Sequence, residues 1–105
     1  GNLEVEVPVS VTEAMRGGTI KVPTLSGSKK IRVQAGTQNG AIQRLRGEGP
    51  PQAGKKTRGD IRYRLNVVIP KELTDDQRRA VDQLAEAMNG DDPRAELLRR
   101  AKAKS

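Results

Sequence analysis

Residues 34–51 read QAGTQNGAIQRLRGEGPP, and this stretch decides how the chain folds. Its two ends, AGTQNG and RGEGPP, combine glycines, which adopt positive φ at little cost, with the only Pro-Pro pair of the chain. Such runs form sharp turns and are poor helix formers. Residues 41–46, which reach the first residue of the second run, predict a strand. We therefore expect the centre of the protein to be a strand framed by two turns.

Several segments around the centre alternate apolar and polar residues, which is typical of half-buried strands. Residues 3–9 form the first, with Pro8 marking a strand end or an edge. Residues 19–23 and 29–33 flank a turn and predict a hairpin. Residues 60–70 follow a long polar loop and form the cleanest strand. The residues expected to face inward are Leu3, Val5, Val7, Val9, Ile20, Val22, Ile31, Val33, Ile61, Tyr63, Leu65, Val67 and Ile69.

Three other segments predict helices. Residues 10–16 form a short one, with Ser10 as N-cap and a glutamate at the capping-box spacing. Thr74 caps a longer helix, and Asp92-Pro93 has the chemistry that begins a final one. The longer helix has an apolar stripe at i, i+3, i+4, i+7 spacing, and the final helix adds two leucines. These residues are Val81, Leu84, Ala85, Met88, Leu97 and Leu98.

Together these elements predict a mainly β protein: a small β-sandwich of short strands with one short helix, followed by a C-terminal helical extension. The expected division is a sandwich over residues 1–70 and a helical segment over residues 71–105. With 33% hydrophobic and 1% aromatic residues in 105, the core is expected to be small and built mainly from Val, Ile, Leu and Ala. The chain begins at Gly1 without an initiator Met, so we expect a piece of a longer protein.

The composition excludes several kinds of chemistry. Without Cys and His, the chain can hold no disulfide, no Cys/His zinc site and no imidazole or thiol catalysis. The acidic pairs Glu4/Glu6 and Asp75/Asp76 lie on an outward strand face and in a first helical turn, so no enzyme activity and no cofactor are predicted. The tripeptide RGD at residues 58–60 is interpreted as a chance match. The lack of Cys, and therefore of disulfides, allows a cytoplasmic setting. No membrane span or signal peptide is visible.

The formal charge of +7 makes an acidic partner or nucleic acid worth considering. The basic residues expected on a solvated strand face are Lys29, Lys30, Arg32, Arg44 and Arg46. Those of the long loop and the tail, which could contact phosphates, are Lys55, Lys56, Arg58, Arg99, Arg100, Lys102 and Lys104. A single Tyr and no Phe or Trp leave almost nothing for base stacking, so a dedicated nucleic-acid module is not expected.

The order of motifs resembles the second carboxy-terminal domain of the DnaJ family of co-chaperones. The matching segments are LEVEVPVSVTEAMRG (3–17), GTIKVPTLSG (18–27), KKIRVQAGTQNGAIQRLRGEGPP (29–51) and RGDIRYRLNVVIPKELTDDQRRAVDQLAE (58–86). Several such motifs in series, covering nearly the whole chain, are far more specific than one Gly-rich piece. Members often carry Phe where this chain has Val11 and Gln43, and fewer aromatic rings imply weaker client contacts.

The resemblance implies the client-binding β-sandwich of a co-chaperone, with a C-terminal helix that joins two protomers into a V-shaped homodimer. In that family the carboxy-terminal domains hold unfolded polypeptide in shallow apolar grooves. A separate J domain then passes the client to the 70-kDa heat-shock chaperone and stimulates its ATPase. This chain has no His, so it lacks the His-Pro-Asp tripeptide of a J domain and is not expected to stimulate that ATPase by itself.

The resemblance also implies site residues. Those of the client groove are Val5, Val7, Ile20 and Val22. The alternative is that these aliphatic residues are simply sandwich core, because each residue of an alternating strand faces one layer or the other. Those of the dimer seam are Val81, Leu84, Ala85 and Met88, with Leu97 and Leu98 as a second anchor; the alternative is that the stripe docks on its own sandwich. Two other functions remain open, a basic β-domain that binds nucleic acid and a purely structural dimerisation arm.

Overall fold

The structure is a computed structural model that describes residues 2–54 and 57–103. The chain divides into two compact units, Gly1–Ile69 and Pro70–Ser105, which we call the β unit and the helical unit. The elements of the β unit are β1 (Leu3–Ser10), α1 (Val11–Arg16), β2 (Gly18–Thr24), β3 (Gly27–Val33), β4 (Ala41–Leu45) and β5 (Ile61–Val68). Those of the helical unit are α2 (Asp75–Ala87) and α3 (Ala95–Ala103).

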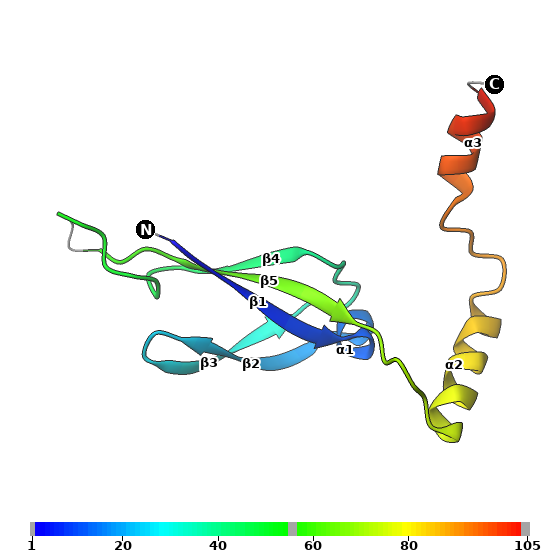
Figure 1. The fold of residues 1–105 in the computed structure, drawn as a ribbon, viewed down its shortest axis with the longest axis horizontal. Helices are drawn as coiled ribbons and strands as arrows, with labels where there is room; N and C mark the ends of the chain where they lie inside the picture. Colours follow the sequence, from blue (N-terminus) through cyan, green and yellow to red (C-terminus); the bar gives the residue numbers. More distant parts are fainter. Residues whose placement is uncertain (1, 55–56, 104–105) are drawn as a thin grey trace. The chain divides into compact units, whose positions relative to one another are not determined.

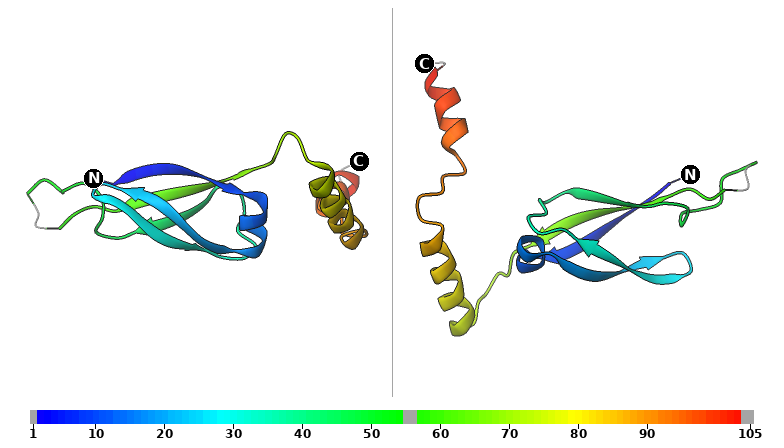
Figure 2. Two further views of the ribbon diagram at one scale, coloured as in Figure 1. Left: turned by 90° about the horizontal axis from the view of Figure 1, so that it is seen from below. Right: turned by 180° about the vertical axis from the view of Figure 1, so that it is seen from behind.

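The β unit consists of two open sheets that face each other. One has three strands in the order β1-β5-β4, and the other is the antiparallel β2–β3 hairpin. Figures 1 and 2 show the two sheets as separate layers, with α1 at one end of the unit. The predicted mainly β sandwich with one short helix is therefore confirmed. β1 is an edge strand, as Pro8 indicated, and it pairs with β5 in parallel, with Leu3 opposite Ile61 and Ser10 opposite Val68.

The core fills the space between the two sheets. β5 contributes the largest share, because Ile61, Tyr63 and Leu65 alternate along it and each is 0% exposed. The other buried residues are Val7, Val9, Ala14, Val22 and Val33. Leu3, Val5, Ile20, Ile31, Leu45 and Val67 are partly buried and pack against this cluster. The predicted inward faces are confirmed for these strand residues, except that the orientation of Leu45 had not been predicted. The two-residue period of a strand assigns alternate side chains to one face.

The turn from β1 into α1 follows the capping chemistry seen in the sequence. The Oγ of Ser10 accepts a hydrogen bond from the Glu13 amide at 3.0 Å, and the Glu13 carboxylate accepts one from the Ser10 amide at 2.8 Å. Gly17 ends the helix with φ of 77°. A Cβ at this position would lie 2.7 Å from the Ala35 nitrogen, so only glycine fits.

The central stretch is a strand between two turns, as predicted. In the first turn, the amides of Gly36 and Thr37 both donate to the Ala14 carbonyl at 2.9 Å, which ties α1 to the central stretch. The second turn leads from β4 into the long loop. The loop is closed at its neck, where the Gly49 amide donates to the Gly59 carbonyl and the Gly59 amide donates to the Pro50 carbonyl, both at 2.8 Å.

Two strand ends differ from the sequence prediction. Ile69 was expected to face inward, yet β5 ends at Val68 and Ile69 is 65% exposed. The reason is that β1, the neighbour of β5, ends at Ser10 opposite Val68, so no strand continues alongside Ile69. Arg46 likewise lies just beyond β4, which ends at Leu45.

The helical unit begins with a second capping box, in which the Oγ1 of Thr74 accepts from the Gln77 amide at 3.1 Å and the Gln77 side chain accepts from the Thr74 amide at 2.8 Å. α2 ends at Ala87, and Gly90 follows with φ of 104°. Neither α2 nor α3 contains a buried residue. None of the helices in the described part of the chain is long and apolar enough to cross a membrane.

Candidate functional site

One side of the sandwich is bridged by a side-chain hydrogen bond and the other is not. On the bridged side, the Nε2 of Gln43 in β4 donates to the Arg32 carbonyl in β3 at 2.6 Å. In the middle, the Oη of Tyr63 in β5 donates to the Pro23 carbonyl at the end of β2, also at 2.6 Å. Because β4 faces β3 and β5 faces β2, β1 lies on the opposite side. On that side, which we call the open side, no side-chain hydrogen bond links β1 to β2 among the described residues, and both are edge strands, as β3 and β4 also are.

The four residues predicted to contact clients lie along this open side and face the interior. Val7 is 8% exposed and Val22 is 1% exposed, so both belong to the core. Val5 and Ile20 are partly buried against the same core and keep part of their surface accessible. The four side chains are thus brought together in one apolar layer. A role in client contact remains a prediction for all four, and Val5 and Ile20 are the ones that a ligand can reach without a rearrangement.

An apolar depression at the α1 end of the β unit was not anticipated from the sequence. It encloses about 420 Å³ between α1, the first central turn and the end of β5. Its apolar wall consists of Val11, Ala14, Met15, Val67 and Ile69, and Thr37, Gln38 and Asn39 form its polar side. Asn39 is held in place because its Oδ1 accepts from the Val67 amide at 2.8 Å. Two sequence signals bear on this surface: Ile69 ends the alternating series of residues 60–70, and Val11 is a position at which family members often carry Phe.

The polar contacts that link the two sheets, and the ion pair beside them, carry little capacity for chemistry. Burial raises the pKa of Tyr63, and the negative charge of Glu48 adds to the shift. The Nζ of Lys29 donates to Glu48 at 2.6 Å, and this hydrogen bond and charge hold the pKa of the Glu48 carboxyl below its usual value. Gln43, a position considered for its missing aromatic ring, instead provides the amide that joins β4 to β3. These groups stabilise the sandwich.

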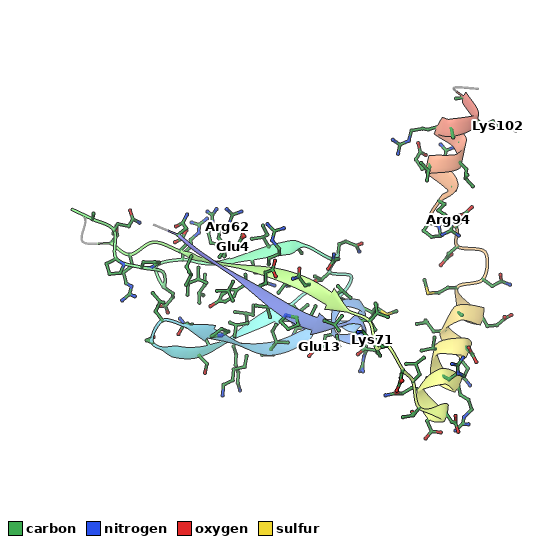
Figure 3. The ribbon with its side chains drawn as sticks, in the orientation of Figure 1. Glu4, Glu13, Arg62, Lys71, Arg94 and Lys102 are labelled. Atoms are coloured by element: carbon green, nitrogen blue, oxygen red, sulfur yellow. The ribbon has the colours of Figure 1, made fainter. Side chains whose placement is uncertain are left out.

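The outer face of the three-stranded sheet carries charges of both signs. Glu4 lies opposite Arg62 in the strand register, and both are labelled in Figure 3. The Glu4 carboxylate is 3.6 Å from the Arg64 guanidinium, whereas the buried Nε of Arg62 has no hydrogen-bond partner within residues 2–54 and 57–103. Glu6 is exposed on the same strand. The carboxylates of β1 are therefore part of a mixed surface and do not form an acid–base pair.

The charged residues of the RGD tripeptide help to close the neck of the long loop. The Nε of Arg58 donates to the Gly49 carbonyl at 2.7 Å, and the Oδ1 of Asp60 accepts from the Gly47 amide at 3.1 Å. Gly59 is buried in the loop neck and Asp60 is partly buried, whereas Arg58 is exposed, so the three residues do not form a fully exposed motif. Lys55 and Lys56 of the same loop, and Lys104 of the tail, lie outside the described residues.

The predicted dimerisation residues are exposed on the helical unit. On the stripe, Val81, Leu84 and Met88 are 47%, 41% and 47% exposed, and Ala85 between them is also exposed. Leu97 and Leu98 on α3 are 62% and 59% exposed. The basic residues of α3 are partly neutralised, since Arg99 and Arg100 pair with Glu96 at 2.7 and 3.5 Å. Contact of these apolar residues with a second protomer remains a prediction.

The fold and these surfaces define a small two-sheet β domain with open strand edges, continued by a short helical unit with an exposed apolar stripe. The model of the family described as DnaJ C terminal domain matches residues 1–70. The chain therefore belongs to the DnaJ C-terminal domain family, which confirms the resemblance read from its motifs.

Curated relatives extend the similarity into the helical unit. The chain is 45% identical over 102 residues to chaperone protein DnaJ 1 of Streptomyces coelicolor, which covers 96% of this chain and 25% of that protein. It is 43% identical over 102 residues to chaperone protein DnaJ 1 of Streptomyces avermitilis, covering 96% and 26%. It is 41% identical over 91 residues to chaperone protein DnaJ of Ruminiclostridium cellulolyticum, covering 87% and 24%. The chain thus spans about a quarter of the length of these relatives.

Proposed function

We propose that this chain is the client-binding and dimerising part of a DnaJ-type co-chaperone. It binds non-native polypeptide on the β unit and pairs with a second copy through the helical unit, without enzymatic activity of its own. In a longer cytoplasmic protein, a J domain would deliver the bound client to the 70-kDa heat-shock chaperone. This assignment is supported by the alignment with a protein named chaperone protein DnaJ 1, which covers 96% of the chain at 45% identity.

The observation that carries the client-binding proposal is the open side of the sandwich. The edges of β1 and β2 offer unpaired backbone donors and acceptors, and an extended peptide can add to such an edge as a further strand. Main-chain hydrogen bonds do not depend on sequence, which suits a protein that binds many different clients. The partly accessible side chains of Val5 and Ile20 lie beside these edges and provide apolar contact.

NMR titration of the chain with a permanently unfolded polypeptide tests this proposal. The expected result is a set of amide shift changes concentrated in β1 and β2. Ile20→Ser should weaken binding, whereas Ile42→Ser is the matched control, because Ile42 is 40% exposed on the outer face of β4 and away from the open side. Thermal melts of both variants establish that they are folded. Shift changes confined to the α1 depression, or equal losses in both variants, would contradict the assignment to the open side.

The dimerisation proposal is supported by the exposed stripe on α2. An amphipathic helix with three large apolar residues more than two-fifths exposed gains stability by covering them, and a second copy offers the same surface for a twofold contact. Light scattering of the chain should give the mass of a dimer. Leu84→Asp should convert it to a monomer because the new carboxylate would be buried in the seam. Gln83→Asp introduces the same charge on the side of α2 that faces away from the stripe and should leave the dimer intact.

A wild-type monomer at high concentration, or dissociation by both variants alike, would rule out this seam. A purely structural role for the chain is the second candidate, and the burial of Val7 and Val22 in the core favours it. That role requires dimerisation with no client-dependent shift change in the β unit. The titration and the light scattering together therefore separate the two functions.

A further inference from the structure

The outer face of the β2–β3 hairpin carries charge of one sign only. The strand register places Thr19 opposite Arg32, Lys21 opposite Lys30, and Pro23 opposite Ser28. These six residues alternate with the inward-facing Ile20, Val22, Ile31 and Val33, so they form the solvent side of the sheet. The three charged residues are all cations and all exposed, and none of the six positions holds a carboxylate. We call this surface the hairpin face.

Several cations of the β unit form ion pairs with a carboxylate of the same chain, whereas the cations of the hairpin face do not do so among the described residues. Lys29 pairs with Glu48, Arg44 with Asp60, and Arg64 with Glu4. Among the described residues, no ion pair or side-chain hydrogen bond involves Lys21, Lys30 or the Arg32 guanidinium. Lys21 and Lys30 moreover lie directly opposite each other, where like charges are destabilising. The arrangement carries an electrostatic cost that an external anion would relieve.

We propose that the hairpin face docks an extended, acidic segment of a partner polypeptide. The ammonium groups of Lys21 and Lys30 start from Cβ atoms about 5 Å apart, so one carboxylate can lie between them. Arg32 is two residues further along β3, about 7 Å away, which is also the distance between alternate side chains of an extended peptide. A segment with acidic residues at i and i+2 therefore matches both positions, and the planar guanidinium can hold the second carboxylate through two hydrogen bonds.

A peptide fits this face better than nucleic acid does. Proteins that bind DNA through its backbone commonly engage about six to ten phosphates, and the hairpin face supplies three cations. Single strands are also held by stacking on aromatic rings. The only aromatic residue of the chain, Tyr63, is 0% exposed and donates to the Pro23 carbonyl inside the sandwich.

The hairpin face is separate from the surface proposed for clients. The side chains of Ile20 and Val22 point into the sandwich, whereas Lys21 between them points outward. An acidic partner on the hairpin face would therefore leave the inner side of β2 unoccupied. This proposal stands or falls independently of client binding, since it concerns charges that do not face the open side.

The test is fluorescence anisotropy with the complete 105-residue chain and a labelled peptide of about ten residues that alternates Glu and Thr. Lys21→Gln combined with Lys30→Gln should weaken binding about threefold to tenfold, the usual effect of two exposed ion pairs. The matched control is Arg46→Gln combined with Lys71→Gln. It removes the same charge from exposed residues outside the hairpin face and should change affinity less than twofold. Raising the salt from about 0.05 M to 0.3 M should weaken wild-type binding because it screens exposed charges.

Three results would overturn the proposal. The first is equal binding of a peptide in which every Glu is replaced by Gln, since the face would then not select carboxylates. The second is an equal loss in the control variant, which would assign binding to net charge alone. The third is tighter binding of single-stranded DNA of about ten nucleotides than of the acidic peptide at the same salt, which would make nucleic acid the partner. Thermal melts of both double variants verify that each is folded.

Discussion

Replacing Tyr63 by Phe should loosen the link between β5 and β2. The ring is 0% exposed and its Oη donates to the Pro23 carbonyl at 2.6 Å. The substitution removes one oxygen and leaves the ring in place, so the main effect is the loss of this hydrogen bond and a carbonyl without its partner. Such a loss costs about 1–2 kcal/mol. For a unit of this size that corresponds to a fall in Tm of roughly 4–16 °C.

The pH dependence of the same variant provides a second measurement. Burial raises the pKa of Tyr63 above the ordinary value of 10.0, so the folded state favours the neutral phenol. The contribution of the neutral Tyr63 phenol to the free energy of unfolding is therefore fully present below pH 10. It is lost as the pH rises through the folded-state pKa of Tyr63. Urea unfolding at about pH 8 and pH 11 should show a larger alkaline loss of stability in the wild type than in Tyr63→Phe. Thr19→Val, which removes an exposed hydroxyl, should change neither value. A Tyr63→Phe protein as stable as the wild type, or with the same alkaline loss, would refute the reasoning.

Three further substitutions test the backbone conformation and the surface charge. Gly17→Ala should destabilise the β unit by more than about 2 kcal/mol, because its Cβ would lie within 2.8 Å of the Ala35 nitrogen and the Val33 oxygen. Gly36→Ala has a similar φ of 81° but open space around the new Cβ and should cost only about 1 kcal/mol in the same thermal melts. Lys30→Glu should raise the free energy of unfolding by about 0.5–1 kcal/mol at low salt, because it places opposite charges across the β2–β3 register. Equal stability of the two glycine variants, or a destabilised Lys30→Glu protein, would contradict these assignments.

Local sequence chemistry was sufficient to predict most of the secondary structure. β5 shows this most clearly, since strict alternation determined which of its side chains fill the core. The two capping boxes, at Ser10 and Thr74, were equally predictable from the sequence, because each depends on residues only three positions apart. Glycines at the turns required no knowledge of distant partners either. Interactions of short range in the sequence are the ones that a single sequence reveals.

The pairing of strands that lie far apart in the chain could not be predicted from the sequence. The alternation of β1 says which side chains share a face, but it does not say that the neighbouring strand is β5 or that the pair is parallel. The role of Gln43 depends on the same information, because its hydrogen bond requires the Arg32 carbonyl in the other sheet. The candidate client residues illustrate the consequence. Alternation correctly predicted that the side chains of Val7 and Val22 face inward. It could not distinguish residues at the bottom of a groove from residues of a filled core.

The open edges themselves suggest how a client would be held. β1 carries Glu4, Glu6 and Pro8, and β2 carries Lys21 and Pro23, which are the features that natural edge strands use to limit uncontrolled pairing. An added segment would pair over few residues on such an edge, and binding of each segment would be weak and reversible. Two β units in a dimer raise the effective concentration of the second site for a long client. Client binding and dimerisation are therefore coupled proposals: a Leu84→Asp monomer should bind a single short segment normally and lose affinity only for clients long enough to occupy both copies.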